Sequence, residues 1–116
     1  MRAALIQLNT GNVIEDAITV AEGFIREAVE QGVAFVSTPE TTHLMEMNRT
    51  LVLEKTFPED QDPGVKRFRA LAAELGIWLH IGSLIIKVAD NRLANRSFLF
   101  SPEGEMIATY DKMHLF

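Results

Sequence analysis

Apolar residues recur every three or four positions in two stretches of the chain, which is the spacing of one face of an α-helix. The first stretch predicts a helix over residues 13–31, with acidic residues in its first turn and Gly32 where a left-handed cap is needed. The second predicts a helix over 63–75, because Asp62 is a favourable N-cap and Pro63 suits the first helical turn.

Short apolar runs around these helices predict strands. Residues 2–9 and 33–36 flank the first helix, and the order strand, helix, strand favours a parallel pair of buried strands. Three more strands are expected at 77–88, 94–100 and 105–112, joined by turn-forming residues into an antiparallel meander. The pattern therefore predicts an α/β domain with a mixed sheet.

Residues 37–62 show the least regular pattern, although their apolar positions permit a short helix. Within the predicted strands, Trp78, Phe98 and Phe100 are expected in the core. His80 lies between apolar neighbours and is interpreted as a hydrogen-bonded core histidine.

Composition narrows the class of protein. The chain has 116 residues, a net charge of -5 and no cysteine, so we expect one domain without disulfides or thiolate metal sites. The charge balance and the lack of a basic cluster argue against nucleic acid as a partner. No apolar run is long enough to span a membrane, and no signal peptide is evident, which predicts a cytoplasmic location. The spacing of the histidines predicts no metal site.

Two charged residues lie where an α/β sheet binds ligands. Glu40 follows the strand 33–36 by a few residues, and Lys112 ends the last predicted strand. If these strands are neighbours, a carboxylate and an ammonium converge at one edge of the sheet. A partly buried ion pair without chemistry is the alternative interpretation. The polar residues 95–97 interrupt an apolar strand and are interpreted as a structural network, with a partner surface as the alternative.

Several blocks of sequence together resemble the carbon-nitrogen hydrolase (nitrilase) superfamily, particularly its bacterial amidases near the ω-amidase and Nit branch. The likeness covers the whole chain, and each block follows the next in the family's order. The matching blocks are Ala4–Asn9, Ile25–Gly32, Thr38–Glu40, Leu71–Ile77 followed by Ile81–Ser83, Asn95–Ser97 and Tyr110–Phe116.

The resemblance implies a hydrolase of amides or nitriles that uses a Glu-Lys-Cys triad and needs no cofactor. Glu40 would be the general base and Lys112 would stabilise the oxyanion. The family's cysteine nucleophile lies beyond the lysine block, so residues 1–116 are expected to be a partial domain that is inactive alone. The implied fold is the N-terminal portion of a four-layer αββα sandwich, a mixed sheet with helices on one face. The implied partners are a small-molecule substrate, the missing C-terminal part or a second copy of the chain.

Two other readings stay open. An inactive binding or assembly module could pair through the open sheet, and an unrelated α/β domain could hold Glu40 and Lys112 only as an ion pair. One departure from the family pattern is Ala17, which stands near the place of a common asparagine.

Overall fold

The computed structural model describes residues 2–5, 13–39, 49–90 and 92–115. The described residues form five strands and three α-helices. In order they are β1 (Ala3–Leu5), α1 (Ile14–Glu30), β2 (Phe35–Thr38), α2 (Arg49–Lys55), the short 3₁₀ turn η1 (Glu59–Gln61), α3 (Pro63–Leu75), β3 (Trp78–Ala89), β4 (Arg92–Phe100) and β5 (Met106–Leu115).

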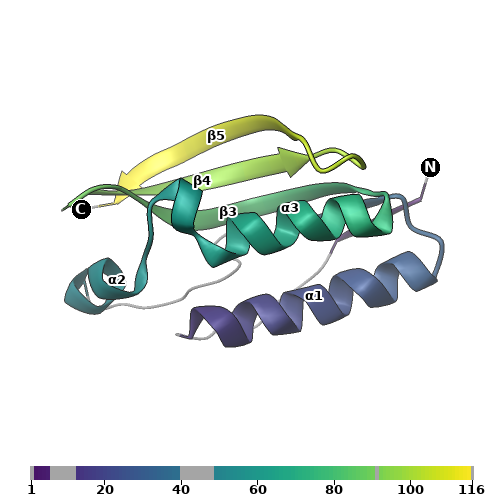
Figure 1. The fold of residues 1–116 in the computed structure, drawn as a ribbon, viewed down its shortest axis with the longest axis horizontal. Helices are drawn as coiled ribbons and strands as arrows, with labels where there is room; N and C mark the ends of the chain where they lie inside the picture. Colours follow the sequence, from purple (N-terminus) through teal and green to yellow (C-terminus); the bar gives the residue numbers. More distant parts are fainter. Residues whose placement is uncertain (1, 6–12, 40–48, 91, 116) are drawn as a thin grey trace.

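All five strands form one sheet in the order β1-β2-β3-β4-β5. β1 and β2 pair in parallel, as do β2 and β3, whereas β3, β4 and β5 form an antiparallel meander. Helices α1 and α3 lie side by side against the same face of the sheet (Figure 1). The predicted α/β class, mixed sheet and placement of the helices on one face are confirmed.

The two long helices begin and end within one residue of their predicted bounds. Asp62 caps α3 as expected, because its carboxylate accepts a 2.9 Å hydrogen bond from the backbone N–H of Val65. Gly76 ends the same helix with φ of 65°, a conformation that costs glycine little. Local capping signals therefore determine where α3 begins and ends.

The core lies between the helices and the sheet. A row of directly paired residues, Val36, Leu79 and Phe100, crosses three strands, and all three side chains are 0% exposed. Ile25 of α1 and Phe68 of α3 are also 0% exposed and belong to the same cluster. Because neighbouring residues in a strand point to opposite faces, this row identifies the face that the helices cover.

Some expectations about burial were wrong. β1 was expected to be buried on both faces, but Leu5 is 86% exposed, because it pairs with Ser37 on the face opposite the helices. Trp78 is only partly buried, since it pairs with Phe35 on the face opposite the helices. Phe98 and Phe100 are buried as predicted. The helix permitted within residues 37–62 is α2.

Candidate active site

Of the two residues that the sequence assigns to catalysis, Glu40 follows β2 in the chain and Lys112 belongs to β5. Glu40 lies outside the described residues, which end on that side at Pro39, directly after β2. Lys112 belongs to β5, and its backbone lies in the described part of the chain. The structure therefore places the strand before Glu40 and the strand that contains Lys112, and the meeting of the two side chains stays a prediction.

The prediction assumed that the strands of Glu40 and Lys112 are neighbours, and the strand order shows that this assumption is wrong. β2 and β5 are not neighbours, because β3 and β4 lie between them. Three strand spacings separate their backbones by about 14 Å. Lys112 also does not end its strand, since β5 continues to Leu115. If the prediction holds, the two side chains meet across the width of the two strands between β2 and β5.

β2 and β5 nevertheless run in the same direction. β2 is parallel to β3, and the two antiparallel steps to β4 and β5 restore that direction. One row of paired residues crosses these four strands: Thr38, Ile81, Phe98 and Thr109. Glu40 follows Thr38 in the chain and Lys112 follows Thr109. From this row, β2 runs toward Glu40 in the same direction in which β5 runs toward Lys112.

Gly82 of β3 fixes the path of the chain at the end of β2. Its backbone N–H donates a 3.3 Å hydrogen bond to Oγ1 of Thr38. A Cβ atom at this position would lie 2.6 Å from the carbonyl oxygen of Pro39 and closer still to that of Thr38. Only glycine permits this approach of two backbones. The segment that leads to Glu40 is thus held by close packing.

β5 contains a bulge at Lys112. Asn95 of β4 pairs with Met113, whereas the next residue, Arg96, pairs with Asp111. One step along β4 therefore corresponds to two steps along β5, and Lys112 is the additional residue. Such bulges bend a strand and redirect a side chain, and they are frequent beside active sites.

Arg96 binds the residue directly before Lys112. Its Nε and Nη2 atoms donate hydrogen bonds of 2.5 and 3.0 Å to the two carboxylate oxygens of Asp111. Its Nη1 donates a 3.0 Å bond to Glu59 of η1. These bonds, the one to Asp111 first, raise the pKa of Arg96 above its ordinary value, so the guanidinium stays charged. The bulge is thereby connected to the helical layer.

The neighbours of Arg96 in β4 are also buried and polar. Ser97 donates a 3.3 Å hydrogen bond from its hydroxyl to the carbonyl oxygen of Tyr110. Asn95 is 7% exposed, and within the described part of the chain its Oδ1 atom has no hydrogen-bond partner. For Arg96 and Ser97, the predicted structural network is confirmed.

His80 takes part in a second polar contact, between β2 and β3. Its Nδ1 atom lies 2.7 Å from the hydroxyl of Ser37, with which it is paired in the sheet. The prediction of a hydrogen-bonded histidine is confirmed, although His80 is only partly buried. Because it alternates with the buried Leu79 and Ile81, His80 lies on the face opposite the helices.

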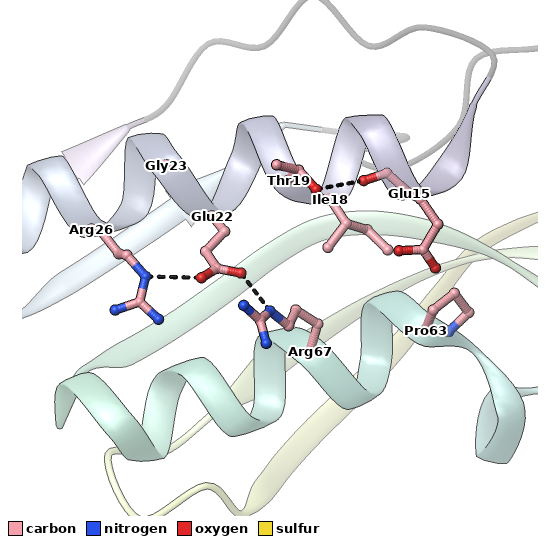
Figure 2. A pocket seen from close by; sticks show the side chains of 8 residues that line it. All are labelled: Glu15, Ile18, Thr19, Glu22, Gly23, Arg26, Pro63 and Arg67. Atoms are coloured by element: carbon pink, nitrogen blue, oxygen red, sulfur yellow. Dashed lines mark hydrogen bonds and ion pairs between the residues drawn. The ribbon is translucent and has the colours of Figure 1, made fainter.

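A groove of about 470 Å³ lies between α1 and α3 (Figure 2). Glu22 lies between Arg26 and Arg67, and Arg26 also pairs with Glu74 at 2.5 Å. Hydrogen bonds, chiefly from Arg67, lower the pKa of Glu22. Because these charges neutralise one another in pairs, the groove has the character of a contact between helices.

Two of these features were not predicted from the sequence. Arg26 and Glu22 have the four-residue spacing of a helical ion pair, but Arg67 and Glu74 come from another helix. The ion pair of Arg96 with Glu59 joins β4 to η1 across the fold. Neither long-range pair has a signal in local sequence, because both depend on how the layers pack.

The described residues contain no group of three or more metal-binding side chains placed to hold an ion. Among the same residues, no helix is long and apolar enough to cross a membrane.

Comparison with known proteins adds to this geometry. The chain is 37% identical to human omega-amidase NIT2 over 119 residues, which cover 99% of the chain and 41% of that protein. It is 30% identical to the deaminated glutathione amidase of Yersinia enterocolitica, covering 97% of the chain and 40% of that protein. The chain thus spans about two fifths of the length of these relatives.

The fold has a counterpart among solved structures. The Caenorhabditis elegans NitFhit protein superposes with a TM-score of 0.85 at 25% identity, over 98% of this chain and 28% of the other. Residues 2–116 match the family model for carbon-nitrogen hydrolases. With its sheet, its helical layer and its amidase relatives in agreement, this chain belongs to the carbon-nitrogen hydrolase family.

Proposed function

We propose that this chain forms part of an amidase that hydrolyses small-molecule amides through a Glu-Lys-Cys triad. Glu40 and Lys112 belong to the chain, and the cysteine comes from outside its 116 residues, which contain none. The observation that carries the proposal is the common direction of β2 and β5, with the chain continuing from β2 toward Glu40 and along β5 to Lys112. The amidase names of the relatives favour amides over nitriles.

Glu40 is assigned the role of general base. A thiol must lose its proton before it attacks a carbonyl carbon, and a carboxylate within hydrogen-bond reach accepts that proton. The same carboxyl group then protonates the departing nitrogen when the C–N bond breaks. Ammonia leaves, and the acyl group remains on sulfur as a thioester.

Lys112 is assigned the stabilisation of the oxyanion. Attack on the carbonyl places negative charge on its oxygen, and a fixed ammonium in a site without water lowers the energy of that state by a few kcal/mol, about 3 in comparable sites. Water, deprotonated by Glu40, next attacks the thioester through a second tetrahedral intermediate. The C–S bond breaks, a carboxylic acid leaves and the thiol regains its proton.

Two experiments test this assignment. The first assays the 116-residue chain alone for ammonia release from a panel of small aliphatic amides. The second assays a hybrid in which the chain replaces the matched part of human omega-amidase NIT2. We expect no release by the chain alone and release by the hybrid. Turnover by the chain alone, or an inactive but folded hybrid, contradicts the proposal.

Variants of the hybrid assign the roles. Glu40→Gln and Lys112→Met should each lower kcat by at least about 100-fold, the scale for loss of a general base or an oxyanion donor. Glu103→Gln and Lys66→Met make the same chemical changes at exposed positions and should leave kcat unchanged. Equal activity in the Glu40 and Glu103 variants, or in the two lysine variants, contradicts the assigned roles.

The proposal includes a homo-oligomer in the cytoplasm. Apolar side chains exposed on α1, Val20 at 51% and Phe24 at 45%, are candidates for a contact between copies. Sedimentation velocity of the hybrid should show a dimer or larger species that Phe24→Lys dissociates. A dimer of the 116-residue chain combined with an inactive hybrid would instead support the assembly module. Cell fractionation tests the location.

A further inference from the structure

The backbone at Lys112 receives less support from the sheet than its neighbours. Asp111 and Met113 have partners in β4, whereas Lys112 is the additional residue between them. The extra residue of a bulge is left unpaired, and the ladder is locally disrupted. Regular strand pairing therefore does not fix the position of this residue, and another constraint is needed if its amine is to act at a defined point.

Arg96 supplies such a constraint through Asp111. Its guanidinium holds both carboxylate oxygens of Asp111, at 2.5 and 3.0 Å, and this two-bond geometry restricts orientation as well as distance. The third bond, to Glu59, fixes the guanidinium itself against η1. The side chain of Arg96 is 21% exposed, so water screens these bonds less than it screens ion pairs on the helices.

A second hydrogen bond, from the other face of the sheet, restricts the movement of the segment that precedes Lys112. Ser97 follows Arg96 and points to the opposite face, and its hydroxyl donates to the carbonyl oxygen of Tyr110 at 3.3 Å. The two residues that precede Lys112 are thus each bound by a side chain of β4. Ordinary stabilisation of the strand pair does not require this concentration of bonds directly before the bulge.

We propose that Arg96 is a positioning residue that holds the bulge at Lys112 through Asp111, so that the amine of Lys112 meets the oxyanion. This inference rests on the proposed function. A displacement of about 1 Å at a reacting group can lower the rate about 100-fold, even when the change lies away from the chemistry. Arg96 itself does not touch the substrate in this assignment.

Hydrogen exchange on the 116-residue chain tests the positioning without any assay of activity. Arg96→Met should accelerate exchange of the backbone amides of residues 111–113 by at least about tenfold relative to the unchanged chain. Arg67→Met removes an arginine from the ion pairs between α1 and α3 and should leave exchange at the bulge unchanged. Equal exchange at the bulge in the two variants would overturn the proposal.

Kinetics of the hybrid test the consequence for catalysis. Arg96→Met should lower kcat about 100-fold with KM changed less than about threefold, whereas Arg67→Met changes neither. Arg96→Lys keeps the charge but loses the two-bond geometry, and it should also lower kcat. The exchanged pair, Arg96→Asp with Asp111→Arg, should recover part of the loss. A kcat loss no greater in Arg96→Met than in Arg67→Met would overturn the proposal.

Failure of the proposed function and failure of the positioning role of Arg96 give different experimental results. If Lys112→Met leaves the hybrid active, the proposed function fails, and with it the catalytic part of this inference. The exchange experiment still decides whether Arg96 holds the bulge. If Lys112→Met abolishes activity but Arg96→Met does not lower kcat, the proposed function stands and the positioning role of Arg96 is wrong. Asp111→Asn, a milder change, repeats both measurements if Arg96→Met does not fold.

Discussion

The segments that lead to Glu40 and Lys112 are held by different physical means. At the end of β2, the backbone of Thr38 and Pro39 lies against Gly82, and a single added carbon would collide with it. At the bulge in β5, charged side chains hold the chain, because Arg96 binds Asp111 and Glu59. The first device responds to side-chain volume and is indifferent to charge. The second responds to charge and to the shape of the guanidinium.

The largest expected effect comes from adding volume at Gly82. Gly82→Ala places a Cβ atom against backbone that has little freedom to move, and we expect a loss of about 3 kcal/mol in the free energy of unfolding. Urea denaturation measures the change. Gly23→Ala is the matched control, because nothing lies within 4 Å of its added Cβ and alanine favours the interior of α1. A Gly82→Ala variant as stable as Gly23→Ala would contradict the steric account.

Loss of the ion pair between Arg96 and Asp111 should have an intermediate effect on stability. Arg96→Met combined with Asp111→Asn forms a double-mutant cycle, in which we expect a coupling energy of about 1–2 kcal/mol for charge-assisted bonds in a half-buried pair. Thermal or urea unfolding of the four chains measures it. A coupling energy near zero would mean that the two side chains are held independently.

Removal of the N-cap of α3 should have a smaller effect on stability. This cap is part of neither the packing at Gly82 nor the charged contacts of Arg96. Asp62→Ala removes the acceptor for the N–H of Val65 and should cost about 1 kcal/mol of stability. Asp62→Asn keeps a side-chain acceptor and should cost less. Equal losses in the two variants would indicate that the charge of Asp62, rather than its hydrogen bond, stabilises the helix.

The smallest effect concerns the ion pairs between α1 and α3. The pKa of Glu22 lies below its ordinary value of 4.5, so its ionised form stabilises the fold. This contribution is fully present above pH 4.5 and is lost as the pH falls through the lowered value. Glu22→Gln should therefore cost about 0.5–1 kcal/mol at pH 7 and less at pH 3. A cost that grows on acidification would contradict the direction of the pKa shift.

The sequence predicts the elements whose signals are local. The bounds of α3 follow from Asp62, Pro63 and Gly76, and those of α1 from its apolar stripe. The bulge at Lys112 has no such signal, because an added residue appears only when β5 is aligned with β4. The exposure of Leu5 likewise depends on which face of the sheet the helices cover. Long-range packing decides both features.

The same contrast between local signals and long-range packing applies to the candidate site. Sequence motifs indicate which residue types carry the chemistry, and the assignment of Glu40 and Lys112 comes from them. What holds their segments, Gly82 on one side and Arg96 on the other, becomes visible only in the folded chain. Glu59 lies 37 positions before Arg96, too far for any local pattern to connect them.

The bulge at Lys112 is one of two in β5, since Ile107 is a second additional residue between Met106 and Ala108. β5 is the last strand in the sheet, so its outer backbone groups form an edge in the described part of the chain. Two interruptions within ten residues make that edge uneven. A foreign strand can then align with only a few consecutive groups, which disfavours templated growth of fibrils.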